Sequence, residues 1–76
     1  MNSEQQRIIE VANELLAYNC TGGSTSEQIA AAFILNDTQY LPVMYSNITQ
    51  AWERLGSEWQ HHVKTIQHNY SHLIQR

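Results

Sequence analysis

The sequence predicts an all-α fold in which two short helices pack on one long C-terminal helix, within a single domain spanning residues 1–76. Three observations support this fold class. Apolar and aromatic residues recur at gaps of three and four after residue 46, and helix-capping residues precede two earlier apolar segments. The composition, with 42% hydrophobic and 14% charged residues, is typical of a folded globular chain.

The first helix is predicted over residues 4–19. Ser3 is placed to cap it, with Gln6 three residues on in the capping-box position. Gly22 or Gly23 is expected to supply the left-handed residue that ends it. The apolar face that would pack inward consists of Ile8, Val11, Ala12, Leu15 and Tyr18.

A second helix is predicted over residues 24–35. Ser24 with Glu27, or Thr25 with Gln28, would form its capping box. Every residue from 29 to 35 is apolar, so this helix is expected to be the buried, inner member of the fold, antiparallel to the first. The connection over residues 36–45 is too apolar for a free loop, and it should pack across the end of the bundle or add to an exposed binding patch.

The long helix is predicted from residue 46 to about residue 75, a length of about 45 Å. Its stripe consists of Ile48, Trp52, Leu55, Trp59, Val63, Ile66 and Tyr70. Gly56 interrupts it, and a break there would give helices over residues 46–55 and 58–75. We favour one helix, with a kink allowed at Gly56, because the stripe continues across the glycine without a change of phase.

Self-association is expected because a chain of 76 residues has a thin core. Cys20 is the only cysteine, so no disulfide within the chain can compensate. Charge is uneven: six acids and one base precede Arg54, whereas three bases and one acid follow from there on. Two copies could therefore attract each other, and a homodimer is the predicted assembly.

The net charge of −3 disfavours general nucleic-acid binding. No signal peptide is recognisable at the N-terminus, and the longest apolar run, residues 29–35, is too short to span a bilayer. The chain is thus expected to be cytoplasmic, not associated with a membrane, and to carry Cys20 as a free thiol.

The histidines are the only candidates for metal binding. His61, His68 and His72 are predicted on one helical line, and the last two have the spacing of two ligands on one face. A third ligand is missing, and no carboxylate partner is recognised at the right turn, so we expect a solvated polar face, with no metal and no cofactor. Full protonation of the four histidines would move the formal charge from −3 to +1, which suggests a pH-sensitive assembly.

A local pattern suggests an alternative function in DNA binding. Residues 26–30 and 46–56 are similar to the two helices of a helix-turn-helix, and Ser46, Asn47, Thr49 and Gln50 would face the base edges. The connection is about ten residues instead of three or four. Arg54 is the only base nearby, although phosphate contacts normally dominate affinity.

The favoured function is therefore binding of another protein by a non-enzymatic helical surface. Aromatic and methionine side chains bring large apolar areas to interfaces, although ordinary core packing explains the tryptophans equally well. An enzyme ranks third, because no nucleophile, acid/base pair or cofactor motif is present. The predicted contact residues are Tyr40, Met44, Tyr45, Trp52, Trp59 and Tyr70.

Overall fold

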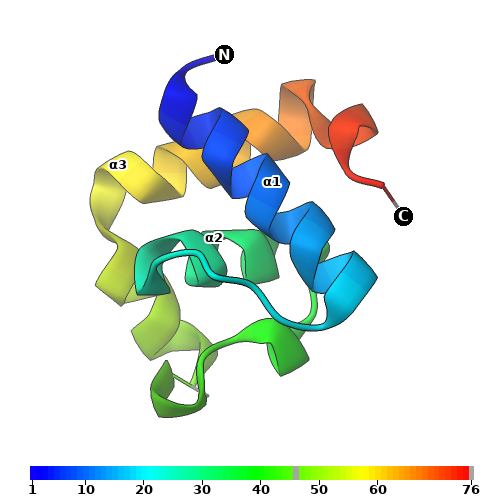
Figure 1. Ribbon diagram of the computed structural model, residues 1–76. Coiled ribbons are helices and arrows are strands. Elements are labelled where there is room, and N and C mark those ends of the chain that lie inside the picture. Colours follow the sequence, from blue (N-terminus) through cyan, green and yellow to red (C-terminus); the bar gives the residue numbers. More distant parts are fainter. Residues whose placement is uncertain (46, 76) are drawn as a thin grey trace.

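The computed structural model describes residues 1–45 and 47–75, and within these ranges it contains helices and no strands. The predicted all-α fold, with three α-helices packed against one another, is confirmed (Figure 1). None of the helices in these two ranges is long and apolar enough to cross a membrane. The elements are α1 (Ser3–Tyr18), α2 (Thr25–Leu35), the 3₁₀ turns η1 (Thr38–Tyr40) and η2 (Val43–Tyr45), α3 (Ile48–Asn69) and the 3₁₀ turn η3 (Ser71–Leu73).

Asparagine side chains and backbones define the ends of α1. Asn2, not Ser3, caps its N-terminus, with Oδ1 accepting a hydrogen bond from the Gln5 amide at 2.8 Å. Asn19, not Gly22 or Gly23, adopts the left-handed conformation at its C-terminus, with φ of 57°. The prediction that a glycine would end α1 was wrong. Asparagine also tolerates the left-handed conformation, and Asn19 precedes both glycines in the chain.

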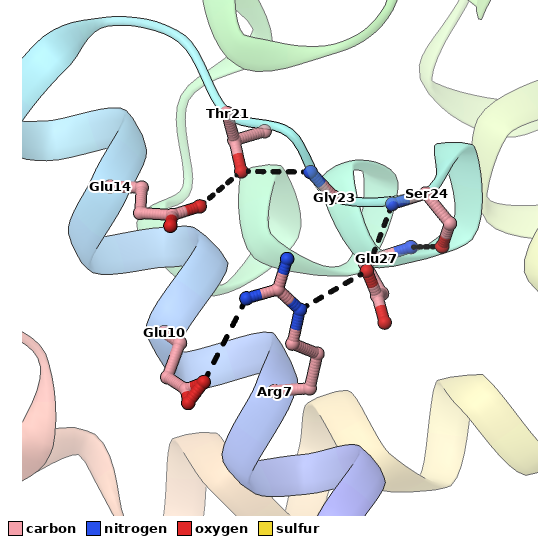
Figure 2. Close-up of polar contacts among 7 residues, drawn as sticks. All are labelled: Arg7, Glu10, Glu14, Thr21, Gly23, Ser24 and Glu27. Carbon is pink, nitrogen blue, oxygen red and sulfur yellow. Dashed lines mark hydrogen bonds and ion pairs between the residues drawn. The ribbon is translucent and has the colours of Figure 1, made fainter.

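The predicted capping box of α2 is confirmed. The Ser24 hydroxyl accepts from the Glu27 amide at 3.2 Å, and the Glu27 carboxylate accepts from the Ser24 amide at 2.8 Å. The same carboxylate lies 3.6 Å from Nε of Arg7 on α1, which ties the start of α2 to the first half of α1 (Figure 2). An antiparallel α2 would begin near Tyr18 instead. The predicted antiparallel pairing is therefore wrong, and α2 crosses α1.

The connection between α1 and α2 runs back along α1 to make this crossing possible. At Gly23 the backbone approaches α1 so closely that an added Cβ would lie 2.7 Å from Cγ2 of Val11. Thr21 supports the turn: its hydroxyl donates to the Glu14 carboxylate and accepts from the Gly23 amide (Figure 2). Gly23 is thus required because its backbone lies too close to Val11 for a side chain to fit, and not because of its backbone conformation.

Replacing Gly23 by alanine should destabilise the fold by about 1–3 kcal/mol, because α1 and α2 would have to separate to admit the methyl group. Gly22→Ala is the matched control, since an added Cβ there meets nothing within 4 Å. Urea unfolding followed by tryptophan fluorescence measures both variants. Equal free energies of unfolding for the two would contradict the tight contact with Val11.

The long helix α3 is bent at Gly56, where the backbone leaves the helical region with φ of 78° and ψ of 167°. Figure 1 shows the two parts of α3 running in different directions on either side of this residue. The kink allowed at Gly56 is confirmed, whereas a straight rod of about 45 Å is not. The side-chain amide of Gln60 donates to the Trp52 carbonyl oxygen at 2.7 Å, an oxygen that the Gly56 amide would occupy in an unbroken helix.

The bend allows both parts of α3 to face the same core. The molecule measures 28 × 28 × 18 Å along its principal axes, whereas an unbent helix of 22 residues would be about 33 Å long. Leu55 before the bend and Val63 and Ile66 after it are all buried. Phase continuity across Gly56 is therefore compatible with the kink, because a helix bent around a core keeps its inner face on both sides of the bend.

The chain leaves α3 at Asn69, earlier than the predicted end near residue 75. After the turn η3, Ile74 folds back into the core and is buried. Asn13 of α1 holds this tail: its amide donates to the Leu73 carbonyl at 3.2 Å, and its oxygen accepts from the Gln75 amide at 2.8 Å. Burial of Ile74 explains why the helix stops.

The core is built around α2, as its uninterrupted apolar run predicted. The three consecutive alanines let the neighbouring backbones approach closely, and all of them are buried. Residues of α1 and of both parts of α3 complete the core. Its fully buried larger side chains are Ile8, Val11, Leu15, Ile29, Val63 and Ile66.

Candidate protein-binding surface

Exposed apolar side chains gather at the end of the molecule formed by η2 and the start of α3. Val43 is 96% exposed and Met44 is 76% exposed, and Ile48 at the first turn of α3 is 51% exposed. In Figure 1 this end lies at the bottom, away from both chain termini. Exposed apolar residues this close in the sequence make this end a candidate contact surface. We call Val43, Met44 and Ile48 the end patch.

A shallow pocket adjoins the end patch, and Ile48 belongs to both. The pocket has a volume of about 110 Å³ and a mostly apolar lining. Ligand pockets usually hold about 300–1,000 Å³, so this one suits the tip of a single inserted side chain better than a small-molecule substrate. Its lining residues are Ala32, Phe33, Asn36, Asp37, Thr38, Leu41 and Ile48.

The predicted contact residues lie in two parts of the structure, three of them in η1 and η2 and three along α3 or at its end. Met44 is exposed in the end patch, and Tyr40 and Tyr45 lie beside it in η1 and η2, partly buried against the core. The other three are also partly buried but lie along α3 and at its end: Trp52, Trp59 and Tyr70.

The two tryptophans lie on opposite sides of the bend, so they do not share one straight helical face. Trp52 packs edge-on against Phe33 of α2, with ring centres 4.9 Å apart. Trp59 packs edge-on against the imidazole of His62 on its own helix, with ring centres 6.0 Å apart. Both rings therefore contribute to folding, and each retains an exposed portion.

Sequence reasoning left Val43 open, since the connection over residues 36–45 was expected either to pack across the bundle or to add to an exposed patch. It missed Ile48 as a surface residue, because Ile48 was assigned to the apolar stripe. Pro42 provides the signal that was available, since a proline next to consecutive apolar residues in a connection favours a turn that projects them.

The residues proposed for base contacts lie at the start of α3, where Asn47, Thr49 and Gln50 are exposed. Asn47 caps the helix, its Oδ1 accepting from the Gln50 amide at 3.0 Å. Ser46 lies outside the described residues. The nearby base is engaged internally, with Arg54 Nε donating to the Tyr45 hydroxyl at 3.3 Å and Nη1 donating to the Ser26 hydroxyl at 3.4 Å. Both hydroxyls are neutral, so Arg54 keeps its positive charge, but two of its N–H groups are engaged within the chain.

The histidines do not form the predicted line. His68 lies in the last turn of α3, but His72 lies in η3 after the helix has ended, so the two do not share a helical face. His61 is exposed, whereas His62 is only 6% exposed. The polar groups around His62 come from α1 and α3, and they form a cluster that the spacing of the other three histidines did not suggest.

Comparison with known proteins adds no relative: no family model, no curated protein and no solved structure matches the chain.

Proposed function

We propose that the protein acts without catalysis by binding another polypeptide chain at the end patch, and that the first such partner is a second copy of itself. The observation that supports this proposal is the exposure of Val43, Met44 and Ile48 beside a pocket of side-chain size. Removing these three side chains from water would supply the driving force for association.

The arrangement is suited to a two-fold symmetric contact. In such a dimer both copies present the same surface. A side chain that projects from one copy must therefore fit a hollow in that surface on the other copy. Met44 is the projecting side chain, and the pocket between α2 and Ile48 is the hollow. Methionine is flexible and polarisable, which allows it to fill an irregular cavity of this size.

The size of the molecule sets the expected strength of the dimer. Stable interfaces bury about 800 Å² on each partner, which would be about a sixth of the surface of 4635 Å². The end patch cannot supply this area alone, so the partly buried Phe33, Tyr40 and Tyr45 around it would contribute the rest. We therefore expect a reversible dimer whose population rises with protein concentration.

Met44→Lys should abolish the dimer while leaving the fold intact, because it would place a charge without a partner in an apolar pocket. Tyr18→Lys is the matched control. Tyr18 was expected on the inward face of the first helix but is 74% exposed, close to the value for Met44, and it ends α1 outside the end patch. Size-exclusion chromatography with light scattering over a concentration series measures both variants. A wild-type chain that stays monomeric throughout the series, or equal dissociation by both variants, would refute the proposal.

A further inference from the structure

The geometry points to a transition-metal site formed by Glu4 of α1 and by Glu58 and His62 of α3. One ligand atom of each residue lies within 4.8 Å of the other two. Nε2 of His62 is 2.9 Å from a Glu4 carboxylate oxygen and 3.8 Å from a Glu58 carboxylate oxygen. The chemical class of the ligand is a divalent cation that accepts nitrogen and oxygen donors, with Zn²⁺ as the type case.

Two elements that are distant in the sequence create this cluster. Glu58 and His62 are four residues apart after the bend at Gly56, so both point from the same face of α3. Glu4 lies in the first turn of α1, directly above that face. The expectation that no carboxylate lies at the right turn for a histidine ligand was wrong for Glu58, which is four residues before His62. Glu4, more than fifty residues away, could be added only by the fold.

The distances require only small adjustments to admit a metal ion. Zinc bonds of about 2.0–2.1 Å place tetrahedral ligands about 3.3 Å apart. Glu4 would move back slightly from His62, and Glu58 would move closer. Both carboxylates are on exposed side chains, 50% and 75% accessible, so these shifts need no change in the backbone. The open side toward solvent leaves room for a water molecule as the fourth ligand.

The buried imidazole is held by a second buried polar group, which is the feature expected of a ligand histidine. Nδ1 of His62 lies 3.2 Å from the side-chain amide nitrogen of Gln5, itself only 8% exposed. Histidine ligands usually donate their other ring N–H to a nearby acceptor that orients the ring. Gln5 can serve in both states: its NH₂ donates to Nδ1 now, and after rotation of the amide its oxygen accepts from Nδ1–H while Nε2 binds the metal.

Charge balance favours a cation at this position. Two carboxylates face a single imidazole, and among the described residues no lysine or arginine forms an ion pair with Glu4 or Glu58. A divalent ion would balance both negative charges. The mixed nitrogen and oxygen donors favour zinc, iron, cobalt or nickel over magnesium and calcium, which prefer oxygen alone.

Calorimetric titration of the full chain with ZnCl₂ tests this site, supported by the visible absorption of bound Co²⁺. We expect saturable binding of one ion per chain and a melting temperature that rises with zinc concentration, because a ligand that binds only the folded state stabilises it. Glu58→Gln removes one exposed ligand without disturbing the core. It should weaken binding by at least about tenfold, since losing only the partner that orients a ligand typically costs 10–100-fold.

Three further variants distinguish this site from adventitious binding of zinc by the exposed histidines. Gln5→Leu should weaken zinc binding about 10–100-fold, and Gln5→Glu should restore it by supplying an acceptor for Nδ1–H. The double variant His68→Gln/His72→Gln is the control and should bind as the wild type does, because these residues lie outside the cluster. The inference is overturned by absence of saturable binding, by unchanged affinity in Glu58→Gln, or by loss of binding in the control.

Discussion

Ile66→Ala is expected to lower the free energy of unfolding by about 2–5 kcal/mol, the range for deleting a fully buried isoleucine side chain down to alanine. Ile66 is completely inaccessible to water and packs after the bend of α3 against the core around α2. A domain of this size is stable by only a few kcal/mol, so the variant should be largely unfolded at room temperature. Ile66→Val, with an expected cost of about 0.5–1.5 kcal/mol, provides a measurable intermediate step.

Ile48→Ala is the matched control, because the same chemical change is made in the same apolar stripe. Ile48 is half exposed, so its truncation in dilute, monomeric protein should change stability by no more than about 0.5 kcal/mol. Urea unfolding monitored by circular dichroism measures all three variants. Similar losses for Ile48→Ala and Ile66→Ala would show that Ile48 is buried as Ile66 is, and would contradict its place in the exposed end patch.

Gly56→Ala is expected to lower the free energy of unfolding by about 1–3 kcal/mol, because its backbone angles lie in a region that only glycine occupies readily. An added Cβ would meet no atom within 4 Å, so the cost is conformational and not steric. Alanine also favours the helical conformation that this position avoids, by about 1 kcal/mol relative to glycine.

Gly22→Ala again serves as the control. Its added Cβ is equally free of contacts, but its φ lies outside the positive region, so only Gly56→Ala should carry the strain. The measurement is the midpoint of urea unfolding together with its slope. An unchanged or increased stability of Gly56→Ala would mean that α3 runs straight through this position.

Local signals in the sequence were sufficient for the fold class and for most helix boundaries. The capping box of α2, its burial and the approximate limits of α1 follow from short-range chemistry, and the structure confirms them. The crossing of α1 and α2 could not be predicted, because it depends on the contact between Gly23 and Val11 across the loop. The bend of α3 could not be predicted either, since an apolar stripe indicates which face of a helix is buried but not whether the helix axis is straight.

The candidate sites show the same division between local and long-range information. Met44 was identified from its residue type and its position in an apolar connection, and it is exposed. The pairing of Glu58 with His62 has a recognisable spacing, but the buried state of His62 and the contributions of Glu4 and Gln5 arise from packing α1 on α3. Titratable residues far apart in a sequence become a site only when their helices cross.

Asn13 links the last turn of the chain to the middle of the first helix through two hydrogen bonds. Residues 71–75 are therefore attached to α1 and do not project as a free segment. Releasing them would expose Ile74 and remove support from α1 at the same time. For so small a protein, this couples the segment after α3 to α1, so that loss of one weakens the other.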